Sequence, residues 1–286
     1  MTTPKAPLAR PLLGGTIAFS HANGFPAGTY RTLFEAWRQA GWRVIAVPKF
    51  GHDAAYPVTG SWPKLREQLA AFIEAEAPGQ QVQLVGHSLG GYLSLMVAAR
   101  RPELVAGVVL LDSPVLAGWR AHSLHMIKLT GQMHRILPSR VSRRRRHQWD
   151  NREAAYTHFA AKAVFARWAP AVLRDYVACG TEADPEGATP DAVKLAFTRE
   201  VESRIYDTLP HRLMDVLRRH PIRVPVAYIG GTRSDEGRRV GLDGIRAITH
   251  GHITWLDGTH LVPMERPADT AAAVLELLAD RVAGRI

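Results

Sequence analysis

Short apolar runs alternate with amphipathic stretches along most of this chain. The runs at residues 82–85 and 105–111 are apolar and rich in β-branched residues, which is typical of strands buried on both faces. The stretch 61–76 instead places apolar residues at the spacing of one helix face. Strands are predicted at residues 15–20, 42–47, 82–85, 105–111, 224–230 and 252–256, and helices at 30–40, 61–76, 91–100 and 268–282. Because strands alternate with helices, the pattern predicts an α/β fold with a mostly parallel, doubly wound sheet and right-handed crossovers.

The alternation of strands and helices is interrupted between residues 117 and 213. Helices are predicted there at residues 119–137, 154–168, 170–176 and 199–207. A helical stretch inside an α/β pattern predicts an inserted cap. The chain is therefore divided into a first part of the core (1–116), a helical cap or lid (117–213) and a second part of the core (214–286).

Length and cysteine content restrict the class of protein. At 286 residues the chain suits one large α/β domain with an insertion, or two small domains. Cys179 is the single cysteine and cannot form an internal disulfide, which is typical of a reducing compartment. No run approaches the roughly 20 apolar residues that a membrane-spanning helix needs, and the N-terminal residues lack the apolar core of a secretory signal. These features predict a cytoplasmic protein without a membrane span.

The positive charge of the chain is concentrated in one segment. The net charge is +10, and residues 117–150 contain eight lysines and arginines against one aspartate. Neither a zinc-finger spacing nor an aromatic RNA-binding signature accompanies them, so we expect no nucleic-acid partner. The densest part contains Arg140, Arg143, Arg144, Arg145 and Arg146. These arginines cannot share one helix face, so most of them should point into water. They form either a solvated cap loop without a partner, or a surface that steers an anionic substrate or an acidic carrier towards a pocket.

One five-residue motif carries a candidate nucleophile. The stretch 86–90 reads G-H-S-L-G, matches the pattern G-x-S-x-G and lies between a predicted buried strand and a predicted helix. A serine on such a sharp turn holds its hydroxyl clear of the sheet, at the positive end of the helix. Gly86 and Gly90 are needed because a Cβ at either position would collide with the neighbouring strand and helix. The pattern also occurs by chance in loops, but its flanking elements favour a nucleophile at Ser88.

A second motif follows the last predicted strand, where residues 258–267 read G-T-H-L-V-P-M-E-R-P. Together with the G-x-S-x-G motif and the order of strands and helices, it resembles the α/β-hydrolase family. The resemblance covers residues 14–116 and 222–284, and the predicted cap lies where that family inserts its lids. It implies that Ser88 attacks an acyl carbonyl and that His260 takes the serine proton and later returns it to the leaving group. The alternative for His260 is a surface histidine without a catalytic role.

The carboxylate that would orient His260 has two candidates. The family usually places this acid in a G-x-x-D turn after the penultimate strand, where this chain has Ser234 followed by Asp235. We favour Asp235, because a one-residue change in the loop could still aim its carboxylate at the imidazole. Asp112, after the strand that follows the motif helix, is the alternative acid, since some members of the family supply the carboxylate there. Asp257 lies too close to His260 in sequence and is interpreted as a turn residue.

Two backbone N–H groups should stabilise the oxyanion. The first is that of Leu89, directly after the nucleophile. The second should come from the loop after the first predicted strand, where N-G-F-P resembles the family's H-G-x-P turn and suggests Phe25 as the donor. If the turn is instead aligned on His21, the donor is Ala22.

The resemblance implies a hydrolase acting on a small-molecule carboxylic ester with an apolar acyl or alcohol part. Aromatic residues of the predicted cap could wall such a pocket, namely Trp119, Phe159, Phe165 and Trp168. Thioester, lactone or C–C bond hydrolysis and acyl transfer stay open, because a fold alone does not choose among them. A non-catalytic ligand-binding protein is the alternative from another class. No cofactor is implied, and no metal site is expected, because His250 and His252 lack a third ligand nearby.

Overall fold

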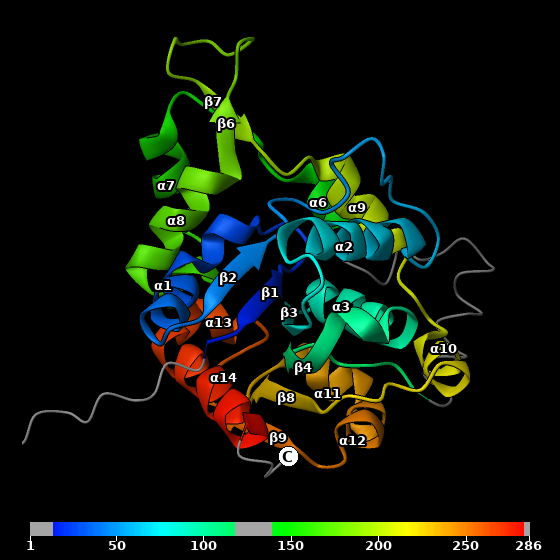
Figure 1. The fold of residues 1–286 in the computed structure, drawn as a ribbon. Coiled ribbons are helices and arrows are strands. Elements are labelled where there is room, and N and C mark those ends of the chain that lie inside the picture. Colours follow the sequence, from blue (N-terminus) through cyan, green and yellow to red (C-terminus); the bar gives the residue numbers. More distant parts are fainter. Residues whose placement is uncertain (1–13, 118–138, 283–286) are drawn as a thin grey trace, which may run out of the picture.

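The computed structural model describes residues 14–117 and 139–282 of the 286-residue chain. A six-stranded sheet with the order β2-β1-β3-β4-β8-β9 forms its centre (Figure 1). Within the described residues, each pair of neighbouring strands in this sheet is parallel, which confirms the predicted fold class. The strands are β1 (Thr16–Ser20), β2 (Arg43–Ala46), β3 (Val82–His87), β4 (Val105–Leu111), β8 (Val226–Gly231) and β9 (Ile253–Leu256).

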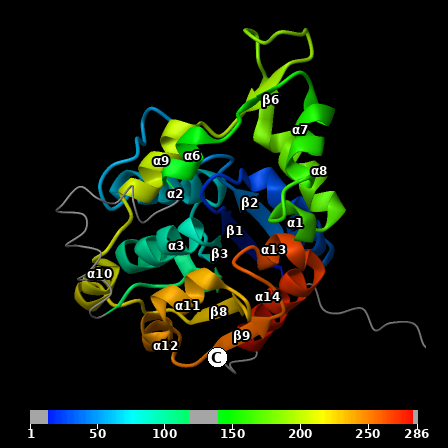
Figure 2. The same ribbon diagram turned by 180° about the vertical axis from the view of Figure 1, so that it is seen from behind.

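Helices cover both faces of the sheet, as a doubly wound arrangement requires (Figures 1 and 2). One face packs against α1 (Arg31–Gln39) and α14 (Pro267–Val282), through residues such as Trp37 and Val274. The other packs against the helices α2 (Pro63–Glu76), α3 (Leu89–Arg100), α10 (Leu213–Arg219) and α12 (Asp243–Thr249). Shorter elements are η1 (Ala27–Tyr30), η2 (Pro102–Leu104), α11 (Asp235–Val240) and α13 (Val262–Glu265). Because both faces are covered, the central strands are buried and consist of apolar residues. These continuous apolar runs are why the strands could be predicted from the sequence.

The segment between β4 and β8 differs from the predicted all-helical cap. Its described part contains α6 (Ser139–Arg144), α7 (Arg152–Ala160), η3 (Phe165–Arg167), α8 (Pro170–Gly180) and α9 (Arg199–Asp207). It also contains a small antiparallel sheet, which the sequence did not predict, of β5 (Gln148–Trp149), β7 (Val193–Leu195) and β6 (Thr181–Ala183). Strands of two or three residues are too short to show an alternating pattern. The helix predicted at 119–137 lies outside the described residues.

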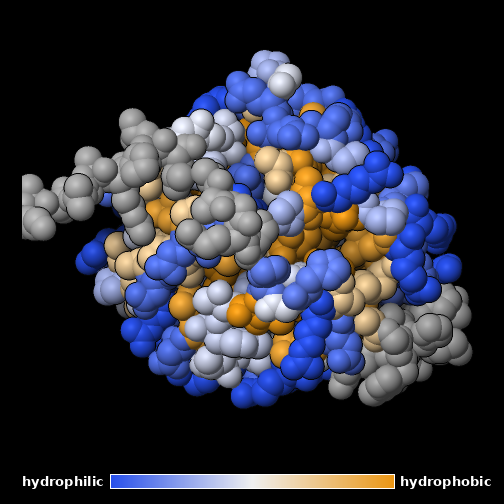
Figure 3. Space-filling view, turned by 60° about the horizontal axis from the view of Figure 1, so that its bottom comes forward, coloured by the Kyte–Doolittle hydropathy of each residue, from blue (hydrophilic) through white to orange (hydrophobic). Residues whose placement is uncertain are grey.

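The surface of one face has hydrophobic residues gathered in its middle and hydrophilic residues around them (Figure 3). Among the large apolar residues that the structure describes, Val164 and Trp255 are exposed. No helix in the described ranges is long and apolar enough to cross a membrane.

The turn between β3 and α3 brings three backbones into close contact. Ser88 has a positive φ of 53° with ψ of −113°, a backbone conformation that costs energy for a residue that has a Cβ. A Cβ on Gly86 would lie 2.4 Å from the Gly90 carbonyl carbon, and one on Gly90 would lie 1.9 Å from the Ser20 oxygen. The predicted collision at both glycines is therefore confirmed. Only hydrogen fits at these two positions.

Gly90→Ala should destabilise the fold by at least about 3 kcal/mol, because the clash is with strand backbone that cannot move aside. Gly60→Ala is the matched control, since a Cβ there meets nothing within 4 Å; its effect should stay within about 1 kcal/mol. Chemical denaturation monitored by circular dichroism measures both. Equal midpoints for the two variants would contradict the packing described here.

Candidate active site

The structure brings Ser88 and His260 together with a buried carboxylate. His260 Nε2 lies 3.0 Å from Ser88 Oγ, and His260 Nδ1 lies 3.0 Å from Asp112 Oδ1. Ser88 follows β3, Asp112 follows β4 and His260 follows β9, so all three come from the carboxyl ends of strands, where α/β folds commonly place their sites. A carboxylate can only accept, so Nδ1 carries the proton in the neutral ring and the Nε2 lone pair faces the serine hydroxyl.

The carboxylate of Asp112 is held by three donors. Its Oδ2 accepts from the Gly231 amide at 2.7 Å, and its Oδ1 accepts from Ser234 Oγ at 2.7 Å as well as from the His260 ring. The side chain is completely buried. Since a buried charge is tolerated only when it is paired and hydrogen-bonded, these donors keep the carboxylate in place and aim it at the imidazole.

Asp235, the acid favoured from the sequence, does not contact His260. It is the first residue of α11, its side chain is exposed, and its carboxylate accepts from Arg238 at 2.5 Å. Ser234 occupies the preceding position and caps α11 by accepting from the Gly237 amide, while its hydroxyl donates to Asp112. The preferred assignment is therefore corrected: the carboxylate at His260 is that of the alternative, Asp112. Because α11 begins at Asp235, the side chain of Asp235 is directed towards solvent.

The environment of His260 favours its protonated form. Burial lowers the pKa of the ring, but the hydrogen bond to Asp112 and the charge of that carboxylate raise it, and the net result lies above the usual 6.5. The charge of Glu236 acts in the same direction. A ring with this pKa can accept a proton near neutral pH and hold it.

The loop after β1 forms a tight turn whose N–H groups differ from the prediction. The Phe25 amide donates to the Ala22 carbonyl at 3.2 Å, and the Ala22 amide donates to Tyr30 Oη at 3.1 Å. Both loop donors considered from the sequence are thus engaged within the protein. The Asn23 amide has no acceptor among the described residues, and Asn23 lines the same cavity as Ser88.

The sequence contained a signal for this turn that was missed. In a β-turn the N–H of the fourth residue donates to the carbonyl of the first residue. The N–H groups of the two central residues therefore point away from that hydrogen bond. Ala22 to Phe25 is such a turn, with Gly24 at the third position and φ of +82°. An Asn-Gly pair is a common centre for turns that need a positive φ. Leu89, the other predicted donor, is the first residue of α3, and the first amides of a helix have no intrahelical acceptor.

A cavity of about 550 Å³ opens over Ser88 and His260. Phe25, Val164 and Leu261 supply apolar parts of its lining. The polar and charged lining residues are Asn23, Ser88, Arg167, Tyr206, Arg233, Asp235, Glu236, Arg238, Thr259 and His260. The size suits one small molecule.

The aromatic residues predicted to wall the pocket lie behind it. Phe159, Phe165 and Trp168 pack against Tyr176, with ring centroids between 5.0 and 5.6 Å apart. Trp168 and Tyr176 in turn contact Phe25. Phe25 therefore connects this aromatic cluster to the cavity. Trp119 lies outside the described residues.

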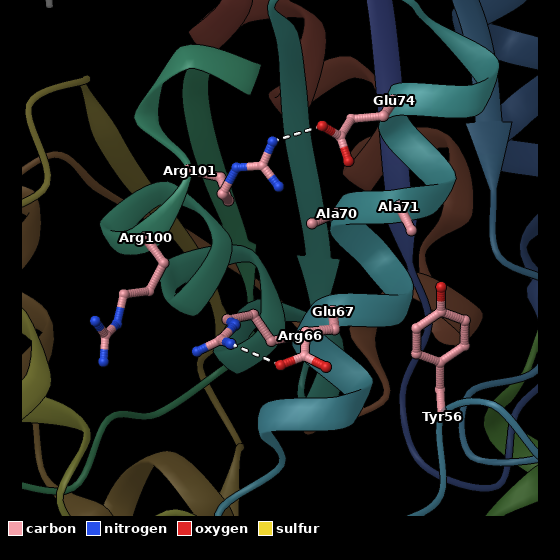
Figure 4. Close-up of a pocket in the computed structure, with 8 residues that line it drawn as sticks. All are labelled: Tyr56, Arg66, Glu67, Ala70, Ala71, Glu74, Arg100 and Arg101. Carbon is pink, nitrogen blue, oxygen red and sulfur yellow. Dashed lines mark hydrogen bonds and ion pairs between the residues drawn. The ribbon is translucent and has the colours of Figure 1, made fainter.

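A second cavity, of about 570 Å³, lies beside α2 and the end of α3 (Figure 4). Its charged side chains are largely paired with one another, as Arg66 with Glu67 and Arg101 with Glu74. None of the described residues that line it is a serine, cysteine or histidine. Despite its similar volume, its lining therefore lacks a serine or cysteine nucleophile with a histidine base beside it.

Two of the clustered arginines are engaged inside the segment rather than pointing freely into water. Arg145 forms an ion pair with Glu202 at 2.6 Å, with only 17% and 8% of the two side chains exposed. Glu202 also accepts from Ser142 at 2.8 Å. Arg143 pairs with Asp207 at 2.6 Å. Arg144 and Arg146 are exposed, and the side chain of Arg140 is not described. Steering of an anionic molecule by this cluster stays a prediction.

The Arg145–Glu202 pair lies against the turn after β1. The Glu202 carbonyl accepts from Asn23 Nδ2 at 2.9 Å, and a Cβ on Gly24 would lie 3.1 Å from the Glu202 carboxylate. Burial raises the pKa of the Glu202 carboxyl, and Arg145 opposes that shift. In the described part of the chain, no group of three or more histidine, cysteine, aspartate or glutamate side chains could hold a metal ion.

Comparisons with known proteins identify the family of the chain. The family model of the alpha/beta hydrolase family matches residues 17–273, so the chain belongs to that family. Probable esterase PIR7A of Oryza sativa subsp. indica is 36% identical over 130 residues, which are 44% of this chain and 48% of that protein. Monoglyceride lipase of Mus musculus is 34% identical over 129 residues, 43% of each chain. The matches thus span about half the length of these curated relatives.

Among solved structures, E-2-(acetamidomethylene)succinate hydrolase superposes with a TM-score of 0.71 at 21% identity, covering 92% of this chain and 91% of the other. The thioesterase domain from the curacin biosynthetic pathway gives a TM-score of 0.66 at 19% identity, covering 93% and 91%. At such identities these structures show the fold alone.

Arg145→Met should destabilise the protein by about 3 kcal/mol, because it leaves the Glu202 carboxylate buried without a cation. Adding Glu202→Gln to that variant should recover part of the loss, since the unpaired charge is then removed. Arg144→Met, next in sequence but exposed, is the control and should change stability by about 0.5 kcal/mol or less. Urea unfolding of the three variants tests this, and equal losses for Arg144→Met and Arg145→Met would contradict it.

Proposed function

We propose that this protein hydrolyses a small carboxylic ester through an acyl-enzyme formed on Ser88. The observation that carries the proposal is the continuous hydrogen-bonded chain Ser88–His260–Asp112 beneath a cavity. A serine hydroxyl is a weak nucleophile on its own and needs an adjacent base that is oriented by a third group. Each of these requirements is met by one residue of the chain.

In the first step, Ser88 Oγ attacks the carbonyl carbon of the ester while His260 Nε2 takes the hydroxyl proton. The resulting imidazolium lies against the buried Asp112 carboxylate, which stabilises its charge. The oxyanion accepts from the Leu89 and Asn23 amides, in place of the Phe25 amide predicted from the sequence. His260 then gives its proton to the alcohol oxygen, the C–O bond breaks, and the alcohol leaves.

In the second step, water attacks the acyl-enzyme. His260 takes one proton of that water, and the same two amides stabilise the second oxyanion. When the C–O bond to Ser88 breaks, the serine oxygen recovers the proton from His260 and the carboxylic acid is released. The enzyme returns to its starting protonation state, and no redox step or cofactor is required.

The cavity and the relatives both support an ester as the substrate class. A volume of about 550 Å³ with Phe25, Val164 and Leu261 in its lining suits a small ester with an apolar acyl or alcohol part. The matches to a protein named as a probable esterase and to a monoglyceride lipase support ester cleavage. The same three residues could also act on a thioester, a lactone or a C–C bond, or transfer the acyl group.

A non-catalytic ligand-binding protein is the rival proposal. It would need the same cavity but no hydrogen bond between Ser88 and His260. The 3.0 Å contacts on both sides of the imidazole favour catalysis, because ligand binding alone gives no reason for a buried carboxylate to orient that ring.

Ser88→Ala should keep the fold and lower kcat for p-nitrophenyl esters by at least about 10³-fold, because the alkoxide has no replacement. The wild type should be labelled covalently by a fluorophosphonate probe, with the mass increase on the peptide that contains Ser88, and the variant should not. A variant with activity within tenfold of the wild type would remove Ser88 as the nucleophile. A panel of esters, thioesters and lactones then ranks the substrates.

Asp112→Asn should lower kcat by about 10⁴-fold, because the amide no longer fixes the tautomer that presents the Nε2 lone pair. Asp235→Asn is the matched control: Asp235 also lines the cavity, but its carboxylate contacts Arg238 and not His260, so kcat should stay within about threefold.

The pH profile gives a second measure of Asp112. The neutral ring is the base, so kcat/KM should rise with pH through the pKa of His260, which Asp112 holds above 6.5. In Asp112→Asn the midpoint of this rise should move to lower pH. A larger loss in Asp235→Asn, or an unmoved midpoint in Asp112→Asn, would overturn the assignment of the acid.

A further inference from the structure

We infer that His87 and Tyr30 are positioning residues. They hold the backbone at His260 in a fixed position relative to the oxyanion turn, which is the turn Ala22 to Phe25 that carries the proposed Asn23 donor. This inference rests on the proposed function, and it concerns two side chains that make no contact with the reacting atoms. His87 stands directly before the nucleophile in the G-H-S-L-G motif, and Tyr30 is the last residue of η1.

A chain of three hydrogen bonds joins the two loops. The Ala22 amide donates to Tyr30 Oη at 3.1 Å, Tyr30 Oη lies 2.7 Å from His87 Nδ1, and His87 Nε2 lies 2.9 Å from the carbonyl oxygen of His260. At one end, Ala22 is the first residue of the turn Ala22 to Phe25, which carries the proposed oxyanion donor, the Asn23 amide. At the other end is the backbone of the proposed general base itself.

The direction of each bond in this chain is fixed by its ends. A carbonyl oxygen only accepts, so His87 Nε2 must carry the proton and donate to His260. His87 Nδ1 then has a lone pair and accepts from the Tyr30 hydroxyl. The Tyr30 oxygen, having donated its proton, accepts from the Ala22 amide. Every donor has one acceptor, so the chain is satisfied in a single arrangement of protons.

The surroundings keep His87 in this neutral tautomer. Burial, and after it the charge of His260, lower the pKa of His87 to about 3. The ring is completely buried and its centroid lies 5.2 Å from that of His260. When His260 becomes an imidazolium during turnover, His87 therefore stays uncharged and its bond to the His260 carbonyl persists.

The consequence for catalysis is geometric. His260 must lie within hydrogen-bond reach of Ser88 while the oxyanion turn faces the same carbonyl group of the substrate. A misplacement of about 1 Å can cost on the order of 10²-fold in rate. His260 and Ala22 are far apart in sequence, and the His87–Tyr30 chain gives them a direct link through side chains. Breaking it should lower kcat while the apolar contacts that bind substrate, and hence KM, stay unchanged.

The test compares His87→Phe, Tyr30→Phe and the double variant with p-nitrophenyl acetate and with a fluorophosphonate. His87→Phe should lower kcat by at least about tenfold with KM within about threefold. The double variant should lose less than the product of the single losses, because a shared hydrogen bond is removed only once. His87→Gln should recover part of kcat, since its amide N–H can reach the position of Nε2 and donate to the His260 carbonyl.

Thr249→Val is the control for loss of a buried hydrogen bond. Thr249 is completely buried and donates to the Ile245 carbonyl at 2.9 Å within α12, away from the site. It should lower the melting temperature without changing kcat. A similar fall in kcat for this control, or full additivity of His87→Phe and Tyr30→Phe, would overturn the positioning role. If His87→Phe does not fold, Tyr30→Phe and His87→Gln carry the same comparison.

The outcomes separate this inference from the proposed function. A wild type that neither turns over esters nor reacts with the fluorophosphonate overturns the proposed function and with it the positioning role. A wild type that reacts, beside a folded His87→Phe variant with unchanged kcat and unchanged labelling rate, overturns the positioning role alone.

Discussion

The site depends first on the close approach of three backbones around the Ser88 turn. β1, β3 and the start of α3 meet where Gly86 and Gly90 leave room for one another and for the Ser20 carbonyl. This contact fixes where α3 begins, and therefore where its first amides point. It also holds Ser88 at a positive φ that an isolated turn would not keep. The surrounding sheet, buried on both faces, supplies the stabilisation that opposes this strain.

A second constraint is the burial of the Asp112 carboxylate. A carboxylate that is shielded from water requires hydrogen-bond donors from the protein. For Asp112 these donors are a backbone amide at the end of β8, a serine that caps α11, and the imidazole of His260. The carboxylate therefore joins the ends of separate strands into one arrangement. Its orientation depends on the fold as a whole, so no single loop determines it.

These two constraints explain what the sequence could predict. The parallel sheet could be predicted because its strands are continuous apolar runs. Ser88 and His260 could be predicted because each lies in a short local motif. Asp112 and Asp235 could not be ranked correctly, since the choice depends on where α11 starts and which way Asp235 then points. The pairing of Arg145 with Glu202 joins residues 57 positions apart, and the small sheet has strands of two or three residues. Neither leaves a periodic pattern.

The segment between β4 and β8 affects the site without supplying any of the three residues of the proposed triad. The turn Ala22 to Phe25, which carries the proposed oxyanion donor, is held from several sides. The neutral His21 ring donates to the Ala22 carbonyl and accepts from the Phe50 amide, Tyr30 accepts from the Ala22 amide, and Asn23 donates to Glu202 of α9. Burial lowers the pKa of His21 to about 4, which keeps that ring neutral. Since Glu202 is itself paired with Arg145 of the same segment, the position of Asn23 depends on how α6 and α9 pack. Sequence changes in this segment can therefore move the proposed oxyanion donor while Ser88, His260 and Asp112 remain in place.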